Sequence, residues 1–364
     1  MRKIIHIVSN NVWGGGEQYV FDLAGRQLAD GIDVEICCRP SEAVSSKYQQ
    51  LGIPVHTMPL RGVMDLKSGL LLSKIVNLAG PCLIHAHNFK DAFTAAYARR
   101  FSANTDVRVV MCRHLTRKGK NSLPYRWLYR QVDRIIFDSE ISRSEFLSTS
   151  PTIDQQKLGI VHTSIQVPRQ LTPIDLRKRY GIAPDEVIAM YHGRHDAEKG
   201  LDVLLEATAI LREKPFRLVL LGHGSAEYSA HLQEVIAQRG IADKVVFTGF
   251  VDAILPYVAS ADFGLLPSIV REGCPLSPME YMSQAHPVIA TDNGGQREYL
   301  CDERNSLLIP PGNSRLLASA MARLIDNREL RNQLGMQAKA DFDSSLNYNI
   351  FYEQMKQQYA LTLL

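Results

Sequence analysis

Short apolar runs, rich in β-branched residues, recur through the first half of the chain with longer amphipathic segments between them. Uninterrupted apolar runs are typical of strands buried on both faces, and apolar positions at helical spacing indicate helices between them. The predicted strands are Lys3–Val8, Val34–Cys38, Val55–Pro59, Leu83–His87, Val107–Cys112 and Ile135–Ser139. The predicted helices include Glu17–Leu28, Leu66–Leu78 and Lys90–Arg100. This alternation predicts a doubly wound parallel sheet, an α/β fold of Rossmann-like type.

The second half repeats the same rhythm after a looser, proline-containing stretch between His162 and Pro184. Its predicted strands are Val187–Tyr191, Arg217–Leu221, Val245–Phe247, Asp262–Leu266 and Pro287–Ala290. Its predicted helices include Leu201–Arg212, Ser229–Arg239 and Arg315–Ile325. We therefore expect two doubly wound parallel-sheet domains, residues 1–166 and 167–342, facing each other across a cleft. The aromatic-rich stretch 343–364 is too short to be a domain, so we expect a C-terminal helix that packs on a domain already formed.

The chain has 364 residues, a formal net charge of +3 and six cysteines. The length suits two domains that each bury a core, and the mild charge gives no reason to expect nucleic-acid binding. The cysteines lack metal-ligand spacing and lie mostly in apolar runs, as reduced thiols of a cytosolic protein do. The first apolar run is too short for a signal peptide or a membrane span, so we expect a cytoplasmic protein.

Two glutamates, Glu272 and Glu280, flank the start of a predicted helix that follows the strand Asp262–Leu266. Ser277 and Pro278 are typical of an N-cap and a first turn, which places Glu272 in the loop and Glu280 in the first helical turn. A loop and a helix start after a parallel strand form the region where open α/β sheets bind ligands. Taken alone, Glu280 is more simply explained as closing its own capping box.

Three glycines, Gly14, Gly15 and Gly16, join the first predicted strand to the first helix. Glycines let the backbone approach a ligand closely, and the free N–H groups at a helix start attract phosphate. A dinucleotide fingerprint is disfavoured, because Tyr19 occupies a required glycine position and Arg39 stands where an acidic residue would close the second strand. A purely structural turn remains an alternative.

Arg194 and Lys199 lie on the loop after the first predicted strand of the second half. A guanidinium and an ammonium on one loop can bind a diphosphate together. Each residue alone is most simply explained as a solvated surface charge. Both on a strand-end loop, together with the helix that carries Glu280, favour a site for an anion.

Several segments resemble the retaining glycosyltransferases of family 4, which have the GT-B fold. The resemblance is carried by Gly14-Gly15-Gly16-Glu17, by GRHDAEKGLDVLLEA, LVLLGHGS and VVFTGFVD, and above all by EGCPLSPME. These segments cover nearly the whole chain in the order of the family. The paired glutamates, together with the loop that carries Arg194 and Lys199, are the most specific part.

The resemblance implies roles for residues of the second half. Arg194 and Lys199 match the pair that binds the donor diphosphate. Glu280 matches the glutamate that binds the ribose hydroxyls of the donor. Glu272 matches the glutamate beside the transferred sugar, and we expect it to be catalytic.

The resemblance also implies roles for the first half. His114 looks like the histidine that contacts the donor sugar in related enzymes, and we expect it to be catalytic. Gly15 and Gly16 lie in the loop that closes over phosphate and acceptor. Family members are usually independent of metal ions, so we expect neither a metal site nor a cofactor. Their tail helix returns to the N-terminal domain, which would give residues 343–364 a packing surface.

The implied function is transfer of a sugar, with retention of anomeric configuration, from a nucleotide-diphosphate sugar that is UDP- or GDP-linked. The expected acceptor is a saccharide or a lipid-linked precursor of a polysaccharide or glycolipid. Two alternatives stay open: a nucleotide-sugar epimerase of the same architecture, and a non-catalytic nucleotide-sugar binding protein.

Some positions depart from the pattern of the family. Ala285 stands where a glycine commonly ends the helix, and a left-handed alanine costs about 1 kcal/mol, so a differently shaped helix end is one expectation. Pro275 cannot donate a backbone N–H. His85 and His87 end a predicted strand and resemble a recurrent pair of the family, although strand-end histidines more often have a structural role.

A basic and aromatic segment runs from Arg113 to Arg134. Its aromatic residues Tyr125, Trp127 and Tyr129 interleave with arginines and lysines. One interpretation is a solvated helix whose aromatic side chains turn into the core. The other is a face that contacts an anionic membrane or a lipid-diphosphate acceptor, which would place the protein peripherally at the inner face of a membrane.

Overall fold

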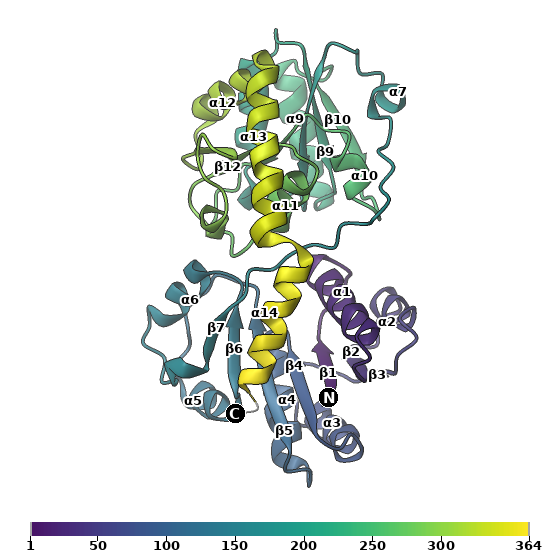
Figure 1. Ribbon diagram of the computed structural model, residues 1–364. Helices are drawn as coiled ribbons and strands as arrows, with labels where there is room; N and C mark the ends of the chain where they lie inside the picture. The colour runs from purple at the N-terminus through teal and green to yellow at the C-terminus, as the bar shows by residue number, and fades with distance from the viewer. Residues whose placement is uncertain (1, 363–364) are drawn as a thin grey trace. The chain divides into compact units, whose positions relative to one another are not determined.

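The chain folds into two compact units, each built on one parallel sheet (Figure 1). The structure is a computed structural model that describes residues 2–362. The first unit takes in the chain up to Thr163 together with the segment that begins at Asn349, and the second unit is Ser164–Tyr348. The chain passes into the second unit slightly before the boundary predicted at residue 166. It returns to the first unit slightly after residue 343, where the tail is predicted to start.

The first unit contains a seven-stranded sheet with the order β3-β2-β1-β4-β5-β6-β7. Its strands are β1 (Lys3–Val8), β2 (Val34–Cys38), β3 (Val55–Thr57), β4 (Cys82–Ala86), β5 (Val107–Arg113), β6 (Arg134–Phe137) and β7 (Leu158–Ile160). Its helices are α1 (Gly15–Ala29), α2 (Glu42–Gln49), α3 (Leu66–Leu78), α4 (Phe89–Phe101), α5 (Leu123–Gln131), α6 (Glu140–Leu147) and α14 (Tyr348–Leu361), with a 3-10 turn η1 (Gln155–Lys157). The strand order reverses between β1 and β4, so right-handed crossovers place the helices that connect the strands on the two sides of this reversal on opposite faces of the sheet.

The second unit contains a six-stranded sheet with the order β10-β9-β8-β11-β12-β13. Its strands are β8 (Val187–His192), β9 (Phe216–Leu221), β10 (Val245–Gly249), β11 (Phe263–Leu266), β12 (Val288–Thr291) and β13 (Ser306–Ile309). Its helices are α7 (Leu176–Tyr180), α8 (Leu201–Ile210), α9 (Ala226–Arg239), α10 (Leu255–Val258), α11 (Leu276–Ser283), α12 (Ser314–Asp326) and α13 (Arg328–Asp341). Shorter helical turns are η2 (Ala197–Lys199), η3 (Gly295–Glu298) and η4 (Phe342–Leu346). Here the order reverses between β8 and β11.

The apolar runs of the sequence become strands that are buried on both faces. All residues of β4 and of β8 are buried, which explains why these strands show no polar alternation. Both sheets are parallel throughout the pairs described, from β1–β4 in the first unit to β12–β13 in the second. The prediction of two doubly wound parallel-sheet domains is therefore confirmed.

The C-terminal helix α14 belongs to the first unit, although the segment before it belongs to the second. Phe351, Tyr352 and Met355 are buried, and the Tyr359 hydroxyl accepts a hydrogen bond from Gln27 Nε2 at 3.2 Å. The helix begins at Tyr348, later than the predicted tail, because Phe342–Leu346 forms a separate π-helical turn.

The segment from Arg113 to Arg134 directs its aromatic side chains into the first unit. Trp127 stacks on Phe93 with ring centroids 6.3 Å apart, and Tyr129 is 2% exposed. Arg113 itself is buried over the ring of Phe89, and this burial lowers the pKa of its guanidinium to about 10. The interpretation with inward-facing aromatic residues is the one that the packing supports.

No helix within residues 2–362 combines the length and the apolar character needed to cross a bilayer.

Candidate active site

The predicted residues of the second half lie at the carboxyl edge of the second sheet, where the strand order reverses between β8 and β11. Loops at such a reversal diverge to opposite faces of the sheet and leave a crevice that binds ligands in open α/β folds. The loop after β8 carries Arg194 and Lys199, and the loop after β11 carries Glu272. The helix α11, which carries Glu280, begins at the end of the second loop.

Lys199 and Glu272 form an ion pair that joins these two loops. The Lys199 ammonium donates to Glu272 Oε1 at 2.6 Å, and the side chains are only 23% and 16% exposed. Ser268 Oγ donates to the same carboxylate oxygen at 2.6 Å. Charge-assisted hydrogen bonds between partly buried groups fix geometry well. They therefore hold one cation and one carboxylate at the carboxyl edge of the sheet, between β8 and β11.

Backbone contacts place the two loops in register. Gly200 has a φ of +74°, and a Cβ there would lie 2.1 Å from the Pro267 carbonyl oxygen. A side chain at Gly294 would meet the backbone of Glu272, whose carbonyl accepts from the Gly295 N–H at 2.9 Å. Glycine is therefore required at both positions for the close approach that sets Glu272 beside Lys199.

Arg194 lies on the same loop as Lys199 but has a different partner. Its guanidinium donates to the carboxylate of Asp196, and its side chain is 69% exposed. Asp196 also accepts from the Lys199 backbone N–H at 3.2 Å, so one carboxylate contacts both residues of the loop. The exposed guanidinium remains accessible to an anion.

Glu280 accepts a hydrogen bond from His192 rather than capping its own helix. The helix α11 begins at Leu276 after Pro275, so Ser277 is not the N-cap, and Glu280 lies beyond the first turn. No side chain of residues 2–362 caps this helix. The capping-box explanation of Glu280 is therefore wrong, because the glutamate points to the end of β8 instead.

A hydrogen bond with Tyr281 fixes the orientation of the His192 imidazole. The Tyr281 hydroxyl donates to the Met190 carbonyl at 2.8 Å, so it accepts from His192 Nδ1 at 2.8 Å. His192 Nε2 is then the ring nitrogen that faces Glu280, so the imidazole joins the end of β8 to α11. No functional role for His192 follows from the sequence alone, because its partner lies far along the chain.

The remaining predicted residues belong to the first unit. Gly15 and Gly16 open α1, and a Cβ at either would have no atom of the described residues within 4 Å. Neither glycine has the positive φ that would demand it. Packing within the described chain therefore gives no reason for glycine at these positions, whereas the free N–H groups of a helix start suit a phosphate.

His114 follows β5 directly and packs edge-on against Tyr19, with ring centroids 4.7 Å apart. Burial lowers the pKa of its imidazole to about 4, so the ring is neutral at physiological pH. Its Nε2 is buried and has no hydrogen-bond partner among residues 2–362.

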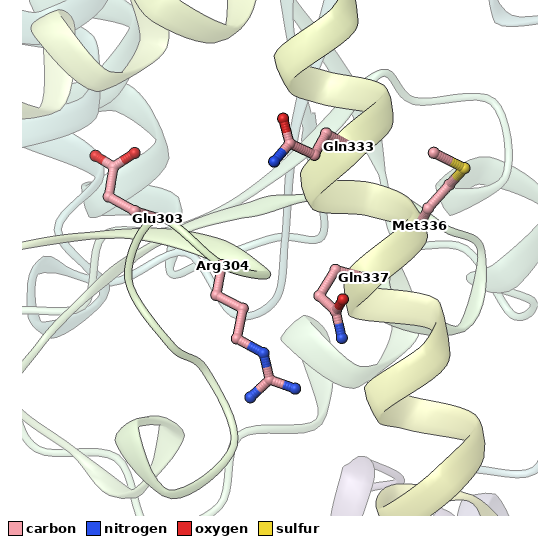
Figure 2. A pocket seen from close by; sticks show the side chains of 5 residues that line it. All are labelled: Glu303, Arg304, Gln333, Met336 and Gln337. Atoms are coloured by element: carbon pink, nitrogen blue, oxygen red, sulfur yellow. The ribbon is translucent and has the colours of Figure 1, made fainter.

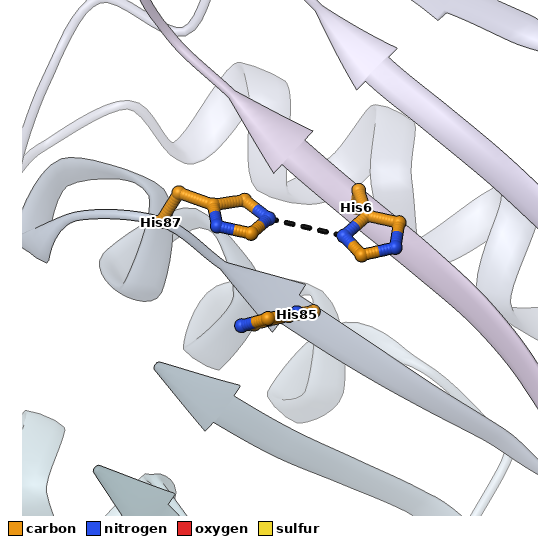
Figure 3. Close-up of side chains that lie close together, drawn as sticks. All are labelled: His6, His85 and His87. Atoms are coloured by element: carbon orange, nitrogen blue, oxygen red, sulfur yellow. Dashed lines mark hydrogen bonds between the residues drawn. The ribbon is translucent and has the colours of Figure 1, made fainter. Parts of the chain in front are cut away.

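Three histidines of the first unit, His6, His85 and His87, form a buried cluster (Figure 3). Their ring nitrogens lie within 4.8 Å of one another, which is close enough to hold a metal ion. An ion between His6 and His87 would have to replace the hydrogen bond of 3.0 Å that joins them. The sequence shows the strand-end pair His85 and His87, but it gives no sign that His6 joins them.

A surface hollow of about 450 Å³ lies elsewhere on the second unit (Figure 2). It is lined by Glu303, Arg304, Gln333, Met336 and Gln337. None of the predicted site residues lines it, and we assign it no role in the chemistry.

Two family models match the chain in succession. The model of Glycosyltransferase Family 4 matches residues 13–169, and the model of Glycosyl transferases group 1 matches residues 174–341. The second match contains all four predicted site residues of the second unit, and the first contains Gly15, Gly16 and His114.

Individual relatives and solved structures agree with these matches. EpsD of Bacillus subtilis, a protein assigned by name to the glycosyltransferases, is 28% identical over 326 residues, which cover 85% of this chain and 84% of EpsD. The D-inositol 3-phosphate glycosyltransferase of Jonesia denitrificans is 29% identical over 365 residues, which cover 88% and 85%. The crystal structure of Anabaena HepE in complex with UDP and glucose has a TM-score of 0.84 at 19% identity, covering 99% of this chain and 100% of that one.

Proposed function

Because the chain belongs to glycosyltransferase family 4 and has the two α/β domains of the GT-B type, we propose that it is a retaining transferase that uses a nucleotide-diphosphate sugar. The observation that carries the proposal is the Lys199–Glu272 ion pair at the reversal of the second sheet, with Arg194 on the same loop. A cation pair and a carboxylate at one sheet edge can bind a diphosphate and a sugar hydroxyl together.

The leaving group of the reaction would be a nucleoside diphosphate. The bond between the anomeric carbon and the phosphate oxygen breaks through an oxocarbenium-like state, and Arg194 and Lys199 stabilise the charge that grows on the diphosphate. Lys199 would then exchange part of its contact with Glu272 for the phosphate. Glu272 would bind the transferred sugar, and Glu280 would bind the ribose hydroxyls.

The acceptor would attack from the face that the diphosphate leaves, which retains the anomeric configuration. Its hydroxyl oxygen bonds to the anomeric carbon, and its proton passes to the departing phosphate. Gly15 and Gly16 would let the N–H groups of α1 approach phosphate or acceptor, and His114 would contact the donor sugar. In this proposal catalysis rests on positioning and electrostatics, without a metal ion or a cofactor.

We propose a UDP- or GDP-linked donor and a saccharide or lipid-linked acceptor. The support for UDP is the nucleotide bound in the crystal structure of HepE. The support for a saccharide acceptor is that several relatives are named for glycan assembly, among them an amylovoran biosynthesis glycosyltransferase of Erwinia amylovora. The glycosyltransferase models do not favour the epimerase alternative. A non-catalytic binding protein is distinguished from an enzyme by turnover.

Donor screening followed by product analysis tests the proposal. UDP-, GDP- and ADP-sugars are compared by thermal shift, because a ligand that binds the native state raises its apparent stability. NMR of the product then gives the anomeric configuration. We expect one donor to be transferred with retention.

Two matched variants accompany this screen. Lys199→Met and Glu272→Gln should each lower kcat/KM at least about 100-fold, because each removes a charge at the reacting end of the donor. Arg212→Met, which removes an exposed arginine paired with the exposed Glu213, should leave turnover unchanged. Inversion, or Glu272→Gln turnover equal to wild type, would contradict the proposed mechanism.

We also propose a peripheral contact with an anionic membrane through the outer side of the segment from Arg113 to Arg134, at the cytoplasmic face. With the aromatic residues packed inward, the exposed apolar side chains there are Leu115 and Leu123, at 58% and 79% exposure, beside the exposed Lys118 and Lys120. Lysines beside exposed leucines suit anionic headgroups. Pelleting with anionic but not neutral liposomes is expected, and Lys118→Glu with Lys120→Glu should abolish it. Equal pelleting with both lipids would end the proposal.

A further inference from the structure

The buried histidine cluster lies at the reversal of the first sheet, on the two central strands. His6 on β1 and His85 on β4 are register partners, and His87 follows β4 directly. The ring centroids of His85 and His87 are 4.2 Å apart, and those of His6 and His87 are 5.3 Å apart. The carboxyl edge at this reversal is the position where an open α/β sheet binds a ligand.

A single amide, that of Gln27, determines the tautomers of His6 and His87. Its Oε1 can only accept, so His6 Nε2 donates to it at 2.8 Å and carries the proton of that ring. His6 Nδ1 is then an acceptor, and His87 Nε2 donates to it at 3.0 Å, as the dashed line in Figure 3 marks.

A second branch starts from the same amide. Gln27 Nε2 donates to the Tyr359 hydroxyl at 3.2 Å, and that hydroxyl is hydrogen-bonded to His85 Nδ1 at 2.9 Å. His85 Nε2 is in turn hydrogen-bonded to the sulfur of Cys112 at 3.0 Å. Gln27 therefore contacts His6 directly and reaches His85 through Tyr359.

The three rings are neutral, so each carries one N–H. Burial lowers the pKa of His6 to about 4 and lowers the pKa of His85 and His87 well below the ordinary range, with the neighbouring histidines adding to the effect. His87 uses its one N–H in the bond to His6. Its Nδ1 is left as a buried lone pair with no partner among residues 2–362.

A buried acceptor without a donor is costly and calls for an explanation. Next to it lies a second buried ring nitrogen without a partner among residues 2–362, Nε2 of His114, whose ring is nearly parallel to that of His87 with centroids 6.1 Å apart. The two residues occupy equivalent positions, directly after the adjacent strands β4 and β5.

We propose that His87 Nδ1 accepts a hydrogen bond from a hydroxyl group of a bound sugar, and that Gln27 is the positioning residue that keeps this nitrogen unprotonated. The proposal deepens the proposed function, because the sugar would be either the transferred sugar of the donor or the saccharide acceptor. Both sources share the chemistry of a hydroxyl donor, and the experiments below separate them.

Two substitutions of His87 test the roles of its two ring nitrogens separately. In His87→Asn the side-chain oxygen lies near the position of Nδ1 and the bond to His6 is lost. In His87→Gln the amide reaches the position of Nε2, so the bond to His6 is kept and the Nδ1 acceptor is lost. We expect His87→Asn to lower Tm but keep kcat/KM within about threefold. His87→Gln should keep Tm and lower kcat/KM about tenfold or more, because it loses one hydrogen bond to the sugar.

Two reactions of His87→Gln, donor hydrolysis and sugar transfer, are compared to identify which sugar His87 contacts. A change in donor hydrolysis, where water is the acceptor, assigns the contact to the transferred sugar. A change confined to transfer assigns it to the saccharide acceptor. If His87→Gln turns over as wild type in both reactions, the proposal is wrong.

A spectroscopic test needs no turnover, so it separates this proposal from the proposed function. Nitrogen-15 NMR of the histidine rings should show His87 protonated at Nε2 only. UDP-glucose should shift the Nδ1 signal if the contacted sugar is that of the donor, and a saccharide acceptor should shift it otherwise. Gln27→Glu, which still accepts from His6, should preserve this tautomer. Gln27→Leu, which cannot accept, should allow the proton of His87 to move to Nδ1. A proton on Nδ1 in the wild type, or an Nδ1 signal that moves neither with UDP-glucose nor with a saccharide acceptor in a chain that binds both, would overturn the proposal. If no nucleotide sugar binds or turns over, the proposed function fails, and glucose alone is then titrated, with an unmoved Nδ1 signal counting against the proposal.

Discussion

Ala285 adopts a left-handed backbone, with a φ of +59°, at the end of α11. The Ala285 N–H donates to Met282 at 3.1 Å and the His286 N–H donates to Tyr281 at 3.0 Å, which is the Schellman arrangement. The expectation of a differently shaped helix end is therefore wrong, because the motif forms despite the Cβ.

Ala285→Gly should raise the free energy of unfolding. Glycine removes the steric cost of the left-handed conformation, and the expected gain is about 1 kcal/mol, reduced by the extra backbone entropy of glycine in the unfolded chain. Urea unfolding followed by circular dichroism measures it. A loss of stability would mean that the alanine methyl makes a packing contact that outweighs the strain.

His192 is the residue whose role the sequence hides, and its substitution separates positioning from folding. His192→Leu removes the donor to Glu280, so UDP should bind about tenfold more weakly if Glu280 holds the ribose. His192→Gln keeps an amide donor near the position of Nε2 and should bind within about threefold of wild type. Calorimetric titration with UDP gives both values. Equal affinity for His192→Leu and wild type would show that Glu280 needs no such support.

Gly15→Ala should separate stability from activity. Alanine has the higher helix propensity and meets no atom of the described chain within 4 Å, so stability should stay equal or rise by up to about 1 kcal/mol. Activity should fall, because a methyl group obstructs a ligand near the α1 N–H groups. Melting temperature and kcat/KM are measured together. Full activity would support the structural-turn alternative.

At the scale of the elements, the strands are the part that the sequence predicts best. The prediction for Lys3–Val8 matches β1 because a parallel strand buried on both faces appears as an uninterrupted apolar run. The helix α13 is not predicted, since it is largely polar and buries little besides Leu334 and Ala338. The start of α11 is displaced because Ser277 and Pro278 resemble an N-cap and a first turn, whereas the N-cap of the helix is Pro275, two residues earlier.

The candidate site follows from the sequence only in part. The loops that carry Lys199 and Glu272 are predicted from strand ends, but their pairing depends on which strands become neighbours at β8 and β11. Local pattern does not determine strand order. The same limit hides His6, whose neighbours on β4 lie far along the chain.

The histidine cluster on β1 and β4 should make the first unit sensitive to acid. Its folded-state pKa values lie below the unfolded value, so the stability is fully present above about pH 6.5 and is lost as pH falls toward 4, by on the order of 1 kcal/mol per pH unit for each ring. Urea unfolding at pH 7.5, 6.0 and 5.0 measures the slope. His6→Gln should reduce it, and His231→Gln, at an exposed position, should not.

Asp91 acts in the opposite direction and needs a control. Burial raises the pKa of its carboxyl group to about 7, so its contribution to stability falls as pH rises from about 4 to 7. The slopes are therefore compared in the background of Asp91→Asn. A slope that is unchanged by His6→Gln in this background would show that the cluster does not govern acid stability.

At the scale of the whole molecule, the two units differ in how the chain builds them. The second unit is continuous from Ser164 to Tyr348, whereas the first is completed only by α14. The Arg134 guanidinium, on β6, donates to Gln358 of this helix, and Tyr359 supplies one branch of the histidine network. The first unit thus reaches its final form only after the second has been synthesised.

Separate expression of the units tests this dependence. Residues 164–348 should fold alone and bind UDP, because they retain Lys199, Glu272 and Glu280 with their partners. Residues 1–163 should lack a cooperative transition, since they leave uncovered the surface that Phe351, Tyr352 and Met355 bury. Joining residues 349–364 to residue 163 through a flexible linker should restore the transition, because the helix supplies both the apolar cover and the hydroxyl that fixes His85. Cooperative unfolding of residues 1–163 alone, with the same urea midpoint as the linked form, would show that α14 adds nothing to the first unit and that Gln27 does not need Tyr359 as a partner.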